Sequence, residues 1–357
     1  MTKKIAVIML TICTSFCVYA EDISVSMDIG EGISYAMENS LTLKSSKANI
    51  EANRYTMISN RKTYQSYREI EMPATSFDTG LMLSGYYVDL TKMQYNISLR
   101  EHEIKKSELK NDVESCFYEY YNCVEKEKLA QTNLDNIKEK AEFQKARLEN
   151  GMISELDYEL FNLSVKNAEN ALVSAKRNTE LSLDKIKSTI NFEGELLIKG
   201  EMPELNVEYV DYNEAITMSR THNTYLAMAE GFDMSEKKWE YAKAYYFPNE
   251  YSYGVERYTF EAAQADYKRN LTAFDNGIKS TYFTLLELKD NLDYMEKYTE
   301  YLSRCKDVSY TKYEMGMITA NQYVDDEQSY FGAKNDLMDL KLAYRTTALA
   351  YKSMYTK

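Results

Sequence analysis

The chain has 357 residues, of which 44% are hydrophobic and 28% are charged, and its formal net charge is −13. This balance is too apolar for a disordered protein, and an acidic chain without a basic run lacks the electrostatic footprint of a nucleic-acid-binding protein. The sequence contains only three prolines, so few residues would interrupt a long helix.

Residues 1–20 have the pattern of a secretory signal peptide. Lys3 and Lys4 precede an apolar stretch over residues 5–18, and Ala20 provides a small-residue cleavage site. The stretch holds about 14 residues, fewer than the roughly 20 that a spanning helix needs, although a short membrane anchor stays open as the alternative. Removal of the two lysines would change the net charge from −13 to −15. We therefore expect an exported protein.

The next segment, residues 21–202, is expected to form the first of two repeats, with a long helical hairpin at about 92–190. Gly151 follows a long periodic segment, where a glycine in the left-handed conformation closes a helix. Ser154 and Asp157 then have the Ser-x-x-acid spacing of a capping box, which starts the returning helix. The first hairpin is therefore predicted to turn at Gly151.

The second repeat, residues 203–357, matches the first at an offset of 165 residues. The sequence Glu-Asn-Gly-Met-Ile-Ser at 149–154 aligns without a gap with Glu-Met-Gly-Met-Ile-Thr in the second half. A Thr-x-x-Gln capping box stands where the first repeat has Ser-x-x-Asp. The second hairpin is expected at about 260–355, with its turn at Gly316 and its cap at Thr319 and Gln322.

The incoming helix of the second hairpin carries a coiled-coil stripe. Ile278, Leu285 and Leu292 recur every seven residues, as in the buried seam between two helices. Helices of this length would extend roughly 80–90 Å, and two hairpins in one chain bury only part of such stripes. The fold class expected is mainly α, with two tandem long antiparallel coiled-coil hairpins, short β-strand segments and assembly into an oligomer.

Three stretches at and after the second turn carry a family resemblance. Residues 312–316 read Lys-Tyr-Glu-Met-Gly, residues 323–325 read Tyr-Val-Asp, and residues 330–337 read Tyr-x-x-Ala-Lys-x-x-Leu. They are similar to the Tyr-x-x-Gly, Asp-Val-Leu-Asp and Leu-Tyr-x-Ala-Lys-x-x-Leu patterns of the TolC-type outer membrane efflux protein family. The resemblance covers nearly the whole chain after the leader.

The resemblance implies a channel-tunnel rather than a catalyst. Three chains would form a hollow α-helical barrel in the periplasm, closed at the hairpin turns and continuous with a β-barrel in the outer membrane. The function implied is that of a passive conduit in a tripartite efflux or type I secretion system. Its partners would be two further copies in a homotrimer, a periplasmic adaptor (membrane fusion) protein, and an inner-membrane pump or ABC exporter.

The resemblance also points to residues of the tunnel entrance. Asp157 and Asp325 match acidic positions that line or lock the closed end, and Tyr313 matches a position that helps to hold the entrance shut. Gln322 stands where the family has an aspartate, which departs from an acidic ring. A capping box alone would account for Asp157 and Gln322, and an ordinary solvated helix face would account for Asp325.

The strand regions depart further from the family. Residues 67–91 leave room for one or two strands, with 77–88 as the better candidate, and 245–259 offers one brief strand around Tyr251 and Tyr253. A spanning strand needs about 9–11 residues. The competing hypothesis is therefore an exported periplasmic coiled-coil structural or adaptor protein that has lost the membrane-spanning β-barrel.

An enzyme is not expected. His102 and His222 fall at unrelated positions, without other ligands at metal-binding spacing, and no cofactor motif is present. The acidic triplet at 325–327 is predicted to lie on a solvated helix face, because adjacent helical residues point in different directions.

Overall fold

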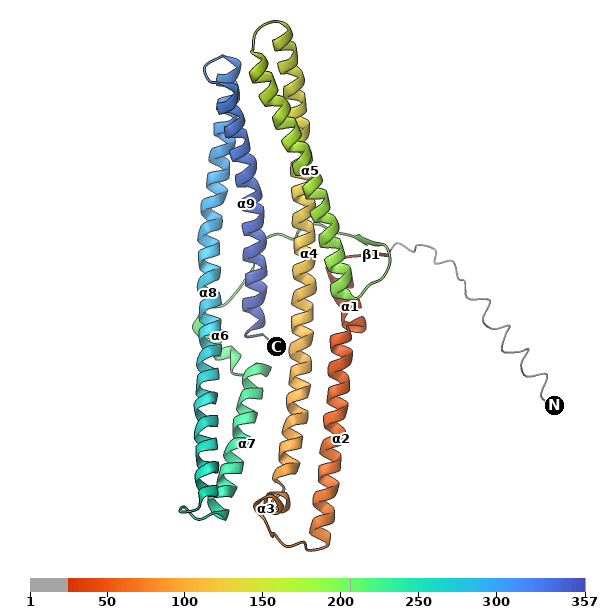
Figure 1. Ribbon diagram of the computed structural model, residues 1–357, viewed down its shortest axis with the longest axis vertical. Helices are drawn as coiled ribbons and strands as arrows, with labels where there is room; N and C mark the ends of the chain where they lie inside the picture. Colours follow the sequence, from red (N-terminus) through yellow and green to blue (C-terminus); the bar gives the residue numbers. More distant parts are fainter. Residues whose placement is uncertain (1–24, 206, 357) are drawn as a thin grey trace, which may run out of the picture.

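A computed structural model describes residues 25–205 and 207–356, so the predicted leader at 1–20 lies outside the described residues. The molecule is elongated and built from two long helical hairpins that lie side by side (Figure 1). In the first, α4 (Tyr86–Glu149) returns as α5 (Glu155–Ile190); in the second, α8 (Tyr251–Glu314) returns as α9 (Ala320–Ser353). The helices α4 and α8 each have 64 residues, so each extends about 96 Å at 1.5 Å per residue.

Shorter helices complete the half of the molecule away from the two turns (Figure 1). Here α2 packs along α4, and α7 packs between α4 and α8. A two-stranded parallel sheet joins the start of the chain to the segment after α5. The elements are β1 (Val25–Met27), α1 (Ile29–Asn39), α2 (Leu41–Glu69), α3 (Phe77–Leu83), β2 (Leu196–Ile198), α6 (Tyr212–Ser219) and α7 (Asn223–Tyr245).

The core is divided into separate clusters along the hairpins. The heptad stripe of α8 is buried as predicted: Ile278, Leu285 and Leu292 pack with Tyr344 and Tyr351 of α9. An equivalent cluster at the level of the sheet joins α1, α4 and α5 around a buried Phe117. Narrow stripes of this kind, rather than one central core, are what long antiparallel helices can bury.

The segment at residues 199–211, which connects the two hairpins, is held at the middle of the molecule. Its carbonyl groups accept hydrogen bonds from side chains of both hairpins: Tyr121 Oη of α4 donates to Lys199 O at 2.7 Å, and Tyr351 Oη of α9 donates to Val210 O at 3.1 Å. Arg345 donates to Pro203 O. These bonds fix the two hairpins to each other far from their turns.

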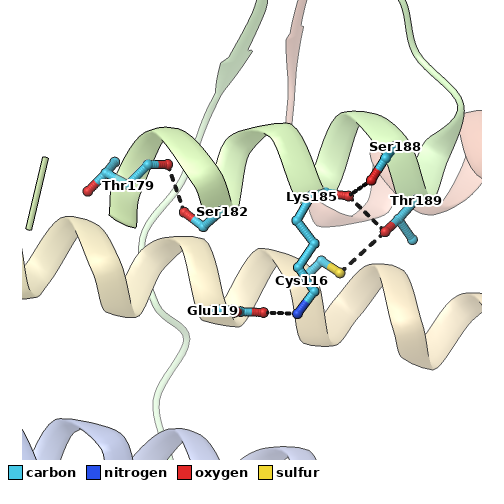
Figure 2. Close-up of polar contacts among 7 residues, drawn as sticks. All are labelled: Cys116, Glu119, Thr179, Ser182, Lys185, Ser188 and Thr189. Atoms are coloured by element: carbon cyan, nitrogen blue, oxygen red, sulfur yellow. Dashed lines mark hydrogen bonds and ion pairs between the residues drawn. The ribbon is translucent and has the colours of Figure 1, made fainter. Parts of the chain in front are cut away.

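A polar network also joins α4 to α5 within the first hairpin (Figure 2). Lys185 pairs with Glu119, and Cys116 Sγ lies 3.5 Å from Thr189 Oγ1. Burial raises the pKa of the Cys116 thiol. This cysteine therefore behaves as a small buried group rather than as a reactive thiolate.

The prediction of strands within 67–91 and 245–259 is wrong. The first region contains the end of α2, all of α3 and the start of α4, and the second contains the end of α7 and the start of α8. Tyr251, Tyr253 and Val255 suggested strand alternation, but Tyr251 and Val255 are also spaced i, i+4, and with Tyr258 at i+7 they share one helix face. The strands found, β1 and β2, lie elsewhere in the chain.

In the part of the chain that the structure describes, no helix combines the length and the apolar composition needed to cross a membrane.

Candidate functional site at the glycine turns

The two turns at the end of the hairpins have the same backbone geometry. Gly151 and Gly316 adopt φ values of 69° and 71°. Met152 N donates to Arg147 O at 2.8 Å, and Met317 N donates to Lys312 O at 2.8 Å, which is the six-to-one bond of a Schellman cap. Each glycine is required because an L side chain is strained in the left-handed region.

Both returning helices begin with a capping box. Asp157 N donates to Ser154 Oγ at 3.1 Å, and the Asp157 carboxylate accepts from Ser154 Oγ at 2.8 Å. Gln322 N donates to Thr319 Oγ1 at 3.3 Å, and Gln322 Oε1 accepts from Thr319 N at 3.1 Å. The contacts of Asp157 and Gln322 within the chain are thus those of helix caps, the alternative that the sequence left open for both.

Tyr313 connects the two hairpins just before the second turn. Its ring is buried, and its hydroxyl donates to Oε1 of the buried Gln144 on α4 at 2.9 Å. The Arg147 guanidinium lies over the ring at 5.4 Å, and the Phe161 ring centre lies at 5.8 Å. Burial raises the pKa of the Tyr313 phenol, so the hydroxyl remains a donor.

A second connection lies one turn of α4 further from the glycines. Lys140 of α4 pairs with Glu327 of α9 and donates a hydrogen bond to Tyr323 Oη. The Lys140 ammonium also lies 5.4 Å from the Tyr310 ring centre. Burial and then the adjacent Glu327 carboxylate raise the pKa of Tyr323. We call Lys140, Gln144, Tyr313, Tyr323 and Glu327 the inter-hairpin cluster.

Asp325 and its neighbours lie in three different environments. Asp325 is exposed, and its carboxylate makes no hydrogen bond or ion pair to any residue that the structure describes. Asp326 accepts a hydrogen bond from Ser309 Oγ of α8. Glu327 is only 5% exposed. The prediction that the whole triplet faces solvent is wrong for Glu327, because the side chain turns toward Lys140 of the other hairpin.

The structure therefore brings together only one of the predicted entrance residues, Tyr313, with groups that sequence reasoning missed. Tyr323 and Glu327 lie on the face of α9 that meets α4, and their i, i+4 spacing was the available signal. Lys140 and Gln144 have the same spacing on α4. Nothing local in the sequence indicates that these two pairs face each other across about 180 positions.

The chemistry of this site is noncovalent. Among the described residues, no three His, Cys, Asp or Glu side chains are grouped as a metal site would require. The inter-hairpin cluster consists of one ion pair, a hydrogen bond between neutral groups and stacked aromatic rings, with Tyr313 and Tyr323 at 5.8 Å. Such contacts hold two helices together and separate without breaking a covalent bond.

Solved bacterial channels have the same architecture. A structure of CusC, from a study of folding and transmembrane channel formation, matches with a TM-score of 0.76 and 11% identity over 92% of each chain. The Campylobacter jejuni CmeC outer membrane channel matches with a TM-score of 0.70 and 12% identity, over 92% of this chain and 85% of that one. The open Neisseria gonorrhoeae MtrE outer membrane channel matches with a TM-score of 0.68 and 15% identity, over 91% and 88%.

Sequence comparison adds nothing to this, because no protein-family model and no curated protein matches the chain. The agreement with the solved channels spans both repeats, since more than nine-tenths of the chain is covered. The fold of the TolC-type outer membrane efflux proteins, which the motifs around Gly316 predicted, is therefore the fold of this chain.

Proposed function

We propose that this protein is the helical conduit of an export system, a passive tunnel closed at its glycine turns. The observation that carries the proposal is the fold shared with outer membrane channels over more than nine-tenths of the chain. An export conduit needs no catalytic group, and the site at the turns offers noncovalent contacts. We place the protein at the cell outer membrane with a periplasmic extension, where a leader would deliver it.

Exposed stripes on the outer helices support closure of the tunnel by further copies of the chain. Exposed residues at seven-residue spacing follow α8 to its C-cap: Tyr294, Tyr301, Val308 and Met315. The helix α5 also begins with two exposed leucines at seven-residue spacing. Because Met315 and the first of these leucines both adjoin the turns, the stripes start at the same level. A homotrimer would bury each α8 stripe against α5 of the next copy.

The turns themselves suit an adaptor protein. Met152, Met315 and Met317 are all exposed there. Methionine side chains are flexible and polarizable, and they are frequent on surfaces that accept partner proteins. We assign these turns to docking of a periplasmic adaptor, which would link the conduit to an inner-membrane pump or ABC exporter.

Opening would separate the hairpins at the inter-hairpin cluster. The hydrogen bonds of the segment 199–211 hold the hairpins at the middle of the molecule, whereas Tyr313 and Lys140 hold them near the turns. An adaptor that binds the separated arrangement more tightly would shift the equilibrium toward it. The entrance residues Asp157, Gln322 and Asp325, which adjoin the turns, would face the opening or its rim.

Export from cells tests the conduit. Cells that lack the protein should accumulate a fluorescent efflux substrate, and the wild-type chain should restore its export. The purified species should have the native mass of a trimer. A monomeric species, or unchanged dye accumulation in the deletion strain and its complement, would contradict the proposal.

A second candidate function is favoured by one observation, the helical structure of 67–91 and 245–259. An exported coiled-coil structural or adaptor component would keep the tunnel helices without inserting strands of its own. Fractionation separates the two candidates. A trimer that leaves the outer membrane only with detergent supports the channel, and a trimer released with the periplasm supports the structural component.

A further inference from the structure

Arg345 is a buried cation where α9 meets α4 and the connecting segment 199–211. The residue is only 5% exposed. Its Nη2 donates a hydrogen bond to Pro203 O in the connecting segment, and its guanidinium lies over the Tyr118 ring of α4 at 4.8 Å. The other terminal nitrogen, Nη1, is buried without a hydrogen-bond partner among the described residues. The junction of the two hairpins and their connection therefore contains an unused donor.

The charge of Arg345 also lacks a carboxylate partner. In the part of the chain that the structure describes, the buried Asp, Glu, Lys and Arg side chains are Glu327 and Arg345, and Glu327 is paired with Lys140. The Glu114 carboxylate acts on Arg345 only through space, because it accepts the Tyr118 hydroxyl at 2.5 Å. Burial lowers the pKa of the Arg345 guanidinium. A buried charge without a partner destabilises a fold, so an added anion here would be stabilising.

A cavity lies beside this guanidinium, between α9 and the connecting segment. Its volume is about 210 Å³, and it is lined by Met202, Pro203, Leu205, Lys341 and Arg345. Lys341 precedes Arg345 by one helical turn and pairs with Glu296 of α8 at 2.8 Å, so its charge is already matched. Pro203 is exposed, which brings one wall of the cavity to the molecular surface. The cavity thus combines apolar side chains, one unmatched cation and a route from solvent.

We propose that this cavity binds a small monocarboxylate with an apolar body, whose carboxylate accepts hydrogen bonds from Nη1 of Arg345. Guanidinium and carboxylate groups form short, charge-assisted hydrogen bonds. An apolar cavity of about 150 Å³ is large enough to bind benzene. The larger cavity here holds a ring of that size together with a carboxylate. Benzoate is the simplest molecule of this class, and its ring would lie against Met202 and Leu205.

The lining of the cavity favours such a ligand over water or a bare inorganic anion. A buried water needs about two to four polar partners, and three of the five lining side chains are apolar. Chloride would neutralise the guanidinium but would leave the side chains of Met202 and Leu205 without an apolar partner. A carboxylate on an apolar body satisfies both the charge and the apolar wall.

Calorimetric titration of the full chain with benzoate tests this inference. The wild-type chain should bind benzoate at a single saturable site, and its melting temperature should rise with benzoate concentration. Arg345→Gln should weaken binding at least about tenfold, because the charge-assisted hydrogen bonds are lost. The matched control Arg304→Gln removes the same charge from a side chain of α8 that is 75% exposed, and it should bind benzoate like the wild type.

A second variant and two further ligands separate binding from folding. Leu205→Trp fills the cavity and keeps Arg345, so it should also lose benzoate binding. Benzamide has the ring without the charge, and acetate has the charge without the ring, so each should bind the wild-type chain at least about tenfold more weakly than benzoate.

Three results would overturn the proposal: no binding of benzoate to the wild-type chain, equal binding to Arg345→Gln or Leu205→Trp, or equal affinity for acetate or benzamide. The cavity is formed by one chain, and the titration does not depend on export. The carboxylate site and the proposed conduit, which is judged by dye export, can therefore fail independently of each other.

Discussion

The ion pair between Lys140 and Glu327 gives the sharpest prediction about the contact between the hairpins. Lys140→Met removes the cation and leaves the Glu327 carboxylate in a position where its side chain is 7% exposed. Loss of one partner from a buried pair costs about 3–5 kcal/mol, and the 22% exposure of Lys140 reduces this to about 2–4 kcal/mol here. The variant should therefore unfold at a clearly lower denaturant concentration.

A surface ion pair between α4 and α5 supplies the control. Lys138 lies 3.5 Å from Glu169, but the two side chains are 50% and 38% exposed. Exposed pairs contribute about 0–1 kcal/mol, so Lys138→Met should have little effect. The double variant Lys140→Met, Glu327→Leu should recover most of the loss, because no charge stays buried in it.

Hydrogen exchange locates the effect. The loss in Lys140→Met should appear as faster amide exchange at the glycine-turn ends of α4, α8 and α9, with no change near the connecting segment 199–211, because opening is local to the missing contact. Equilibrium unfolding at one fixed protein concentration gives the magnitude. If Lys140→Met and Lys138→Met behave alike in both assays, the burial argument for this pair is refuted.

Three further predictions concern single positions. Gly316→Ala should lower the free energy of unfolding by about 1 kcal/mol, because φ is 71° there. Gly277→Ala inside α8 should raise the free energy of unfolding by about 0.5–1 kcal/mol. Melting temperatures of the two variants that shift in the same direction would contradict this. Tyr313→Phe should cost about 1–3 kcal/mol, because the buried amide that accepts its hydroxyl is left unpaired, and a denaturation midpoint equal to that of the wild type would argue against it. Burial lowers the pKa of His102 and of His222 below the ordinary 6.5, so the unfolded state binds more protons and the free energy of unfolding should fall as the pH drops below 6.5. The variant His102→Gln, His222→Asn should flatten melting temperatures between about pH 7 and pH 5.5, since asparagine can also cap α7.

Local chemistry in the sequence was sufficient to predict the turns. Gly151 and Gly316 follow long periodic segments, and a Ser-x-x-acid or Thr-x-x-Gln pattern stands directly after each. A left-handed cap and a capping box involve only residues within six positions of one another, so neither depends on the rest of the fold. The seven-residue stripe through Leu285 similarly predicted a buried helix face from spacing alone.

The strand prediction failed where the same apolar residues fit both a strand and a helix. Tyr251, Tyr253 and Val255 alternate as in a strand, but Tyr251, Val255 and Tyr258 also lie on one helix face, and the residues that follow continue the helix α8. Short apolar runs do not distinguish the two periods by themselves. In this chain both regions that were expected to form strands contain helix ends joined by short connections.

The inter-hairpin cluster was decided by tertiary structure alone. Lys140 and Glu327 are 187 positions apart, and their meeting depends on the register between two hairpins that share no local sequence signal. The acidic triplet showed this most clearly, because Asp325 faces solvent while Glu327 is buried two residues later. The sequence by itself determined that the chain folds into two capped helical hairpins, since each depends on nearby residues. Only the packing of one hairpin against the other decided which polar side chains became an ion pair, because burial is a property of the assembled surfaces.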